Sequence, residues 1–174
     1  MTSRVYLIGY RGTGKTTVGG LLARRLGHTF VDADVLLEER AGRSIADIFA
    51  TEGEPGFRDR ESDVLAHLSR QPRHIIATGG GVILRPANRE ILRNTGFVAW
   101  LAADPDTVWQ RMVTDPTTAG RRPNLTAKGG LDEVRELITA REILYRETAN
   151  LRIETDRESP ESIADRILAA WTGS

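Results

Sequence analysis

The 174-residue sequence has no cysteine, and this absence excludes several kinds of chemistry. Without thiols there is no disulfide framework, no thiolate zinc site and no cysteine nucleophile. Long apolar runs are also missing, since none approaches the roughly 20 residues that a membrane-spanning helix needs. No basic and apolar leader precedes the first expected strand. We therefore expect a soluble, cytoplasmic protein with no membrane partner.

Neither sign of charge is in excess, because 24 Lys and Arg residues are balanced by 24 Asp and Glu residues. A balanced chain creates no overall field that attracts polyanions, so we expect no nucleic acid partner. The length fits one domain that buries most of its apolar surface. We expect a single domain over residues 1–174 and a monomer.

A glycine-rich segment near the N-terminus carries a complete phosphate-binding motif. Residues 9–16 read Gly-Tyr-Arg-Gly-Thr-Gly-Lys-Thr, which fits the P-loop pattern G-x-x-x-x-G-K-[ST]. An apolar run at 5–8 precedes the motif and an amphipathic helical pattern follows it. Such a loop places backbone N–H groups at the positive end of a helix dipole, where phosphate binds. We expect Lys15 to reach the β- and γ-phosphates of a nucleotide and the Thr16 hydroxyl to ligate Mg²⁺.

Apolar runs alternate with capped, amphipathic segments along the whole chain. The expected strands cover 4–9, 29–32, 74–78, 97–101 and 151–154. The expected helices follow the P-loop and cover 34–41, 45–52, 86–94, 105–113, 131–148 and 160–171. This alternation predicts an α/β fold of three layers, in which helices flank a five-stranded parallel sheet. Ligands of such folds bind beyond the carboxyl ends of the strands.

Two carboxylates follow the second expected strand. Asp32 and Asp34 are two residues apart, and strand geometry would direct both toward the P-loop. One could hold Mg²⁺ through its water shell, and the other could orient or deprotonate an attacking hydroxyl. The alternative is that Asp34 caps the helix that continues at Val35, which is a frequent role for aspartate. The spacing leaves both interpretations open.

Two further segments interrupt the regular pattern. Thr78-Gly79-Gly80-Gly81 follows an apolar strand, and its glycines would allow close backbone approach to a ligand, although a plain flexible turn is the alternative. Residues 114–130 have almost no apolar periodicity and carry several basic side chains. Long loops inside compact domains are often functional lids, and a basic lid suits a protein that encloses phosphates. A disordered connector is the alternative.

Taken together, these motifs resemble those of shikimate kinases, a family of small P-loop kinases related to nucleoside-monophosphate kinases. The resemblance extends over nearly the whole chain. It rests on the P-loop at 9–17, Phe-Val-Asp-Ala-Asp at 30–34, Gly-Arg-Ser-Ile-Ala-Asp-Ile-Phe at 42–49, Gly-Phe-Arg-Asp-Arg-Glu at 56–61, Thr-Gly-Gly-Gly at 78–81, Arg-Arg-Pro at 121–123 and Arg-Glu-Ile-Leu-Tyr-Arg at 141–146. It implies a kinase core with the P-loop at 9–17, a substrate-binding region at 33–61 and a lid at 114–127.

The resemblance also implies an activity, in which the γ-phosphate of ATP passes to the 3-hydroxyl of shikimate with Mg²⁺ as cofactor. The catalytic residues it implies are Lys15, Asp34 and Arg122, with Arg121 as the alternative lid arginine. Shikimate would contact Asp34, Arg58, Gly79, Gly80, Gly81, Arg122 and Arg141. The nucleotide would contact Gly12, Thr13, Gly14, Lys15, Thr16, Thr17, Arg111 and Arg157. The metal would be held by Thr16 and Asp32.

Two other functions compete with this interpretation. A different small-molecule kinase of the same fold, such as a gluconate kinase, would share the P-loop, and only the anion-binding pair Arg58 and Arg141 argues against it. A GTP-binding switch would also share the P-loop. Against the switch, the sequence contains no Asn-Lys-x-Asp guanine motif, and the strand at 74–77 is followed by Thr-Gly-Gly-Gly rather than by a Walker-B aspartate.

Overall fold

The structure is a computed structural model that describes residues 3–115 and 129–172. Within them, five strands form one parallel sheet in the order β2-β3-β1-β4-β5. The strands are β1 (Arg4–Ile8), β2 (Thr29–Asp32), β3 (His74–Ala77), β4 (Phe97–Ala102) and β5 (Leu151–Glu154). The prediction of a five-stranded parallel sheet is confirmed.

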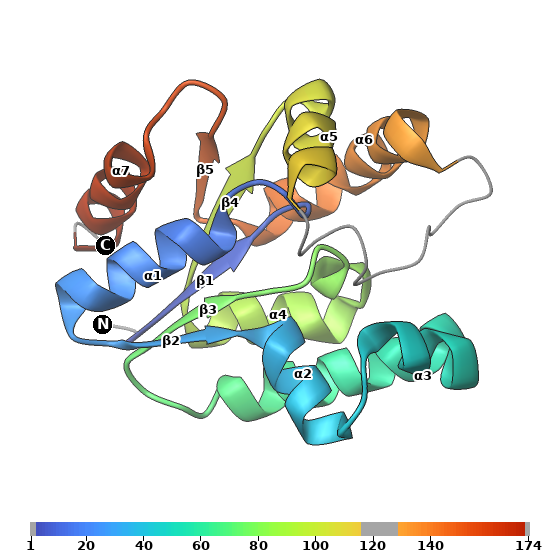
Figure 1. The fold of residues 1–174 in the computed structure, drawn as a ribbon. Coiled ribbons are helices and arrows are strands. Elements are labelled where there is room, and N and C mark those ends of the chain that lie inside the picture. The colour runs from blue at the N-terminus through green and yellow to red at the C-terminus, as the bar shows by residue number, and fades with distance from the viewer. Residues whose placement is uncertain (1–2, 116–128, 173–174) are drawn as a thin grey trace.

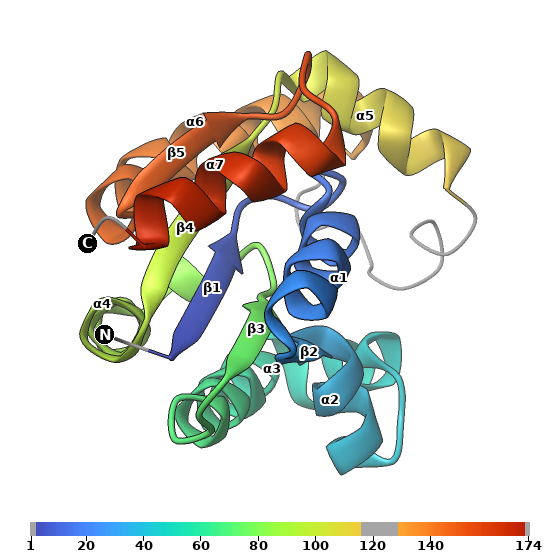
Figure 2. The ribbon, with the colours of Figure 1, turned by 90° about the vertical axis from the view of Figure 1, so that its left-hand side faces the viewer.

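Helices cover both faces of this sheet, which gives the three predicted layers (Figures 1 and 2). They are α1 (Lys15–Leu26), α2 (Ala33–Ala41), α3 (Ile45–Leu68), α4 (Pro86–Thr95), α5 (Pro105–Thr114), α6 (Gly130–Thr148) and α7 (Pro160–Thr172), with a 3₁₀ helix at Val82–Leu84. Helices α1 and α7 pack together on one face. Helices α3, α4 and α6 contribute to the core on the other face.

The central strand explains why its sequence is a continuous apolar run. Val5 and Leu7 belong to the core cluster beneath α1 and α7, whereas Tyr6 and Ile8 belong to the opposite cluster. All four side chains are fully buried. A strand covered on both faces has no solvent side, so its residues do not alternate between apolar and polar.

Several helices begin at proline and N-cap residues of the sequence. Pro86 and Pro105 each occupy the first turn of a helix. The side chains of Ser44 and Asp104 accept hydrogen bonds from backbone N–H groups in the first turns of α3 and α5. These caps satisfy donors that have no partner inside the helix.

Helix α3 is longer than the predicted 45–52. Gly53 has a non-helical conformation (φ 69°, ψ −175°) and marks a kink directly after the predicted range. The chain then resumes a helix that runs to Leu68, which the prediction missed. Pro55 lies at the start of this second part, where a missing N–H costs no hydrogen bond. Tertiary burial of its face, including Phe57, Glu61 and Leu65, stabilises the segment.

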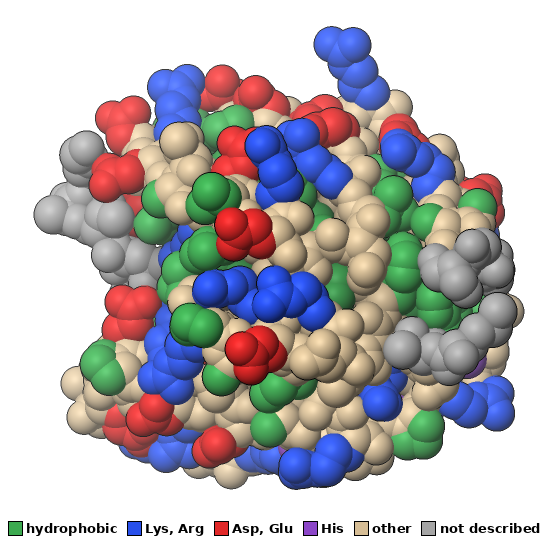
Figure 3. All heavy atoms as spheres, turned by 180° about the vertical axis from the view of Figure 1, so that it is seen from behind, with side chains coloured by type: hydrophobic (Ala, Val, Ile, Leu, Met, Phe, Trp, Pro, Cys, Tyr) green, Lys and Arg blue, Asp and Glu red, His purple; other side chains and the backbone are tan. Residues whose placement is uncertain are grey.

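The surface shows the charge balance of the composition. On the part of the face drawn in Figure 3 that the structure describes, acidic and basic side chains are interspersed. Among residues 3–115 and 129–172, no helix combines the length and apolar character needed to cross a bilayer.

Candidate functional site

A cavity of about 1300 Å³ opens at the carboxyl ends of the strands. Its walls come from the P-loop, the β2–α2 junction, the glycines after β3 and the loop after β5. The predicted residues that line it are Gly12, Thr13, Gly14, Lys15, Thr16, Thr17, Asp32, Asp34, Gly79, Gly80 and Arg111. Segments that are far apart in the sequence therefore meet at one cavity, because parallel strands end at the same edge of a sheet.

The P-loop connects β1 to α1 through three glycines with positive φ: Gly9 (140°), Gly12 (77°) and Gly14 (91°). A Cβ at Gly9 would lie 2.3 Å from the carbonyl oxygen of Leu101, so a side chain there would clash with β4. The ammonium of Lys15 donates hydrogen bonds to the carbonyls of Gly9 (2.8 Å) and Tyr10 (2.7 Å). The loop therefore holds this cation beside the N-terminus of α1, where an anion is favoured.

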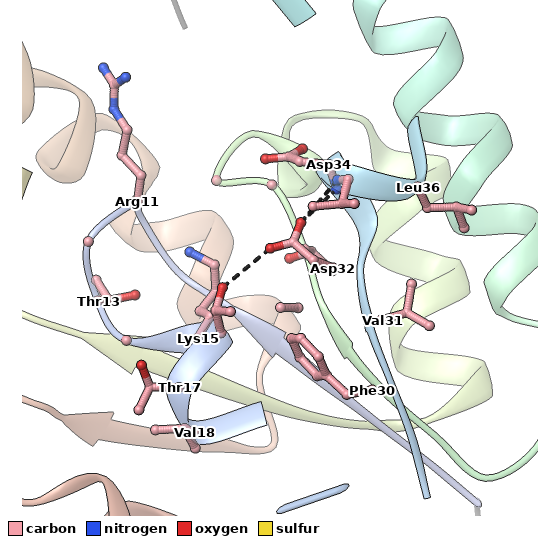
Figure 4. Close-up of a pocket in the computed structure, with 18 of the residues that line it drawn as sticks. Arg11, Thr13, Lys15, Thr17, Val18, Phe30, Val31, Asp32, Asp34 and Leu36 are labelled. Atoms are coloured by element: carbon pink, nitrogen blue, oxygen red, sulfur yellow. Dashed lines mark hydrogen bonds between the residues drawn. The ribbon is translucent and has the colours of Figure 1, made fainter. Parts of the chain in front are cut away.

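Asp32, rather than Asp34, is the N-cap of α2. One carboxylate oxygen of Asp32 accepts hydrogen bonds from the backbone N–H groups of Asp34 (3.0 Å) and Val35 (3.3 Å). The hypothesis that Asp34 caps this helix is wrong, because the helix begins at Ala33. Helical rather than strand geometry therefore sets the direction of Asp34. Figure 4 shows Lys15, Asp32 and Asp34 around the same space.

The second oxygen of Asp32 faces the P-loop and accepts a hydrogen bond from the Thr16 hydroxyl at 3.3 Å (Figure 4). A hydroxyl and a carboxylate are the oxygen ligands that Mg²⁺ prefers. Within the described residues, no group of three or more Asp, Glu or His side chains could hold a metal by itself. The pair therefore fits an ion that takes its other ligands from water and from substrate phosphates.

Arg58 lies on the second part of α3 and forms a buried ion pair. Its Nη1 donates to Glu61 at 2.8 Å, and its Nη2 donates to Glu54 at 3.1 Å. The side chains of Arg58 and Glu61 are only 7% and 5% exposed. Burial opposes the charge on Arg58, but Glu61 and then Glu54 outweigh burial and raise the pKa of the guanidinium above its ordinary value. Arg58 is therefore held as a cation.

The glycine segment after β3 adjoins this cation. A Cβ at Gly81 would lie 2.3 Å from Nη1 of Arg58, so the guanidinium packs directly on the Gly81 backbone. Arg141 of α6 is also buried, at 6% exposure, and its guanidinium lies 5.9 Å from the ring centre of Tyr10. Arg58, Gly81 and Arg141 do not line the main cavity themselves. Gly81 follows the glycine wall that Gly79 and Gly80 form, and Arg58 packs on Gly81.

Arg111 of α5 connects the P-loop to the loop that follows β5. Its guanidinium donates to the carbonyl of Gly12 (3.2 Å) and to both the hydroxyl and the carbonyl of Thr155 (3.2 Å each). Thr155 and Pro160 line the cavity, but Arg157 does not and is exposed. The structure thus brings Arg111 to the predicted site and leaves Arg157 outside its wall.

The predicted lid at 114–127 falls almost wholly on residues 116–128, which lie outside the described part of the chain. Arg121 and Arg122 are among them. Their expected roles remain predictions.

The structure reveals two site residues to which the sequence analysis assigned no role. Glu61 is the buried partner of Arg58. Tyr145 donates a hydrogen bond of 2.5 Å to the carbonyl of Gly80. Both lie inside motifs that were recognised, and Tyr145 is four residues after Arg141, so helical spacing alone places the two on one face of α6. The signal was present, but it does not distinguish a structural tyrosine from a functional one.

Comparison with known proteins gives a consistent result. The family model described as "Shikimate kinase" matches residues 11–172. The chain is 50% identical over 170 residues to a shikimate kinase of Rhodopirellula baltica, covering 98% of this chain and 91% of that protein. It is 48% identical to one of Symbiobacterium thermophilum, covering 94% and 93%. A solved shikimate kinase of Acinetobacter baumannii in complex with shikimate is similar in structure, with a TM-score of 0.91, 38% identity and coverage of 99% and 94%.

Proposed function

We propose roles for the residues of the site from one premise: this chain belongs to the shikimate kinase family. The protein is an ATP-dependent kinase that transfers the γ-phosphate to the 3-hydroxyl of shikimate, giving shikimate 3-phosphate and ADP. One observation supports the assignment of roles above all others. Lys15 and Asp34 line the same cavity, although they belong to different strand–helix junctions.

The P-loop holds the nucleotide. The backbone N–H groups of residues 12–17 surround the phosphates, and Lys15 neutralises charge on the γ-phosphate as it is transferred. In the structure Lys15 donates to two P-loop carbonyls, so it lies beside the place that the phosphates would take. Arg111 bridges the P-loop and Thr155, and so it frames the nucleotide from the side of β5.

Thr16 and Asp32 are the residues that would hold Mg²⁺. Their oxygens lie 3.3 Å apart at the mouth of the P-loop, and both are of the type that the ion prefers. When bound, Mg²⁺ would supply positive charge to the β- and γ-phosphates. Asp32 also caps α2, so this carboxylate couples the metal position to the helix that carries Asp34.

Asp34 positions the acceptor hydroxyl. Its carboxylate accepts the hydrogen bond of the 3-hydroxyl and takes its proton as the oxygen attacks phosphorus. Arg58 and Arg141 pair with the carboxylate of shikimate, a task that suits the planar fork of a guanidinium. The glycine segment 79–81 contacts Arg58 at Gly81 and the start of the P-loop at Gly80, where it would border the ring. In-line placement of acceptor and donor then supplies most of the catalysis.

The lid residues complete the proposal. Arg122 would contact both substrate and the transferred phosphoryl group. The segment 114–127 would exclude water, so that ATP is not hydrolysed.

A coupled assay of ADP release tests these roles with purified enzyme. Asp34→Asn preserves shape and removes the base, so we expect kcat with shikimate to fall about 10²- to 10⁴-fold. Lys15→Met should cost a similar factor. Asp47→Asn, an exposed helix-start carboxylate outside the cavity, is the matched control. Normal turnover in Asp34→Asn would contradict the role of Asp34. Preference for gluconate as acceptor, or for GTP as donor, would contradict the activity itself.

A further inference from the structure

The Tyr145 hydroxyl makes a buried contact that the proposed reaction does not use. Tyr145 lies on α6, which runs beside β4 (Figures 1 and 2), and its side chain is 2% exposed. Its ring stacks on Trp100 with centres 5.5 Å apart and planes 20° apart. The hydroxyl donates to the carbonyl of Gly80 at 2.5 Å. Helix α6 therefore makes a hydrogen bond to the backbone of the glycine wall.

Gly80 occupies the junction between the two halves of the site. A Cβ built on Gly80 would lie 3.5 Å from the carbonyl oxygen of Gly9, 3.5 Å from Cα of Tyr10 and 3.6 Å from the Tyr145 hydroxyl. The peptide is thus packed between the start of the P-loop and Tyr145. The next residue, Gly81, carries Arg58 against its backbone. A shift of the Gly80 peptide would therefore move an acceptor contact relative to the phosphates.

Arg141 belongs to the same junction. It precedes Tyr145 by one helical turn, is buried and has its guanidinium 5.9 Å from the centre of the Tyr10 ring. Burial raises the pKa of the Tyr145 phenol well above its ordinary value, while the charge and hydrogen bonding of Arg141 oppose the increase. The phenol therefore stays protonated at neutral pH, as a donor to Gly80 must.

A second cavity of about 350 Å³ lies beside this junction and is lined by Tyr10, Trp100 and Tyr145 among others. The hydrogen bond to Gly80 fixes the phenol on a side where packing is incomplete. Losing the hydroxyl would also leave the buried Gly80 carbonyl without this donor, which is costly.

We propose that Tyr145 is a positioning residue. It fixes the Gly80 peptide and Arg141 relative to each other, and so fixes the position at which the acceptor carboxylate binds. This role rests on the proposed function, because it assumes that Arg58 and Arg141 bind that carboxylate. Tyr145 acts through Gly80 and Arg141.

Tyr145→Phe tests the proposal because it keeps the ring and its stacking on Trp100. We expect the KM for shikimate to rise about tenfold while the KM for ATP stays within about twofold. The matched control is Tyr6→Phe, which removes another buried phenol, bonded to the Thr95 hydroxyl at 2.8 Å. The control should lower the Tm to a similar degree and leave both KM values unchanged. An Arg141→Lys background should also shrink the effect of Tyr145→Phe, since the two residues act on one contact.

Each other outcome overturns a defined claim. Equal KM values in Tyr145→Phe and wild type, or a parallel rise in both KM values, contradict the positioning role. Loss of cooperative unfolding in Tyr145→Phe also contradicts it, because the hydroxyl would then be structural. A wild-type enzyme that does not phosphorylate shikimate contradicts the proposed function instead, whatever the variants do.

Discussion

In the proposed site, the nucleotide side and the acceptor side are built in different ways. The phosphate-binding part of the nucleotide side is local: Lys15 and Thr16 begin α1 directly after the glycine loop, and Lys15 donates to backbone carbonyls of that loop. The acceptor side is assembled from distant segments. Arg58 comes from α3, Gly81 follows β3 and Arg141 comes from α6.

This difference has a physical basis. Phosphate is recognised by backbone N–H groups, which every residue carries, so a short glycine-rich loop suffices. A carboxylate inside a protein needs cations, and buried cations need counter-charges such as Glu61. The acceptor side therefore depends on tertiary packing to a degree that the P-loop does not. Variants on the two sides should fail in different ways.

The largest effect is expected from removing the buried cation of the acceptor side. Arg58→Met leaves Glu61 as a buried charge without its main partner, which should lower the free energy of unfolding by about 3–5 kcal/mol. Shikimate affinity should fall as well. Urea unfolding and the coupled assay measure the two losses. Arg146→Met, in an exposed pair with Glu142 on α6, should have little effect on either.

The double variant Arg58→Met, Glu61→Met separates stability from binding. Because it removes both buried charges, it should recover most of the lost stability without recovering shikimate affinity. Recovery of both properties would show that the acceptor side does not use Arg58.

Asp32 allows the same separation on the nucleotide side. Asp32→Asn keeps the N-cap of α2 but loses the charge, so the Mg²⁺ concentration for half-maximal activity should rise about 10- to 100-fold with little change in Tm. Asp32→Ala should in addition lose about 1 kcal/mol of stability. Ser44→Ala, which removes the cap of α3, should show the stability loss alone. Unchanged Mg²⁺ dependence in Asp32→Asn would mean that the carboxylate serves only as a cap.

A methyl group on Gly81, next to the glycine wall, tests how closely the nucleotide side and the acceptor side adjoin. Gly81 has φ −101°, which alanine adopts freely, but the new Cβ would meet the Arg58 guanidinium at 2.3 Å. Gly81→Ala should raise the KM for shikimate about 10- to 100-fold while the flexible arginine relieves the clash and preserves the fold. Gly20→Ala, in α1 outside the cavity lining, is the matched control, since its nearest contact is at 3.9 Å. Equal behaviour of the two variants would contradict this picture.

The smallest effect is expected at Glu52, where hydrogen bonds from Arg60 join the two parts of α3 across the kink. Hydrogen bonding and charge from Arg60, together with Arg43, lower the pKa of Glu52 below its ordinary value of 4.5. A lowered pKa means that the ionised form stabilises the fold, fully above pH 4.5 and less as the pH falls through the folded value. Glu52→Gln should therefore lower the Tm slightly at pH 7.

Thermal melts between pH 7 and pH 3 measure this difference. The gap between wild type and Glu52→Gln should close as the solution becomes acidic. Glu90→Gln, on an exposed position of α4, is the control for the substitution itself. A gap that widens toward low pH would contradict the assigned sign.

Much of the fold could be predicted because its signals are local. Pro86, Pro105 and the cap residues Ser44 and Asp104 mark helix starts through short-range hydrogen bonds and sterics. The helix after Gly53 carries a proline and a glycine, Pro55 and Gly56, which are weak helix formers. It was missed because its stability comes from burial against the rest of the domain rather than from its own propensity.

The site divides in the same way. The sequence by itself determined that a phosphate-binding loop joins a buried strand to a helix, because glycine spacing and one lysine specify that geometry within a few residues. Only the tertiary structure decided that Thr16 meets Asp32, that Arg58 packs on Gly81, and that Tyr145 reaches Gly80. Burial and distance between remote segments govern those contacts, and neither follows from spacing along the chain.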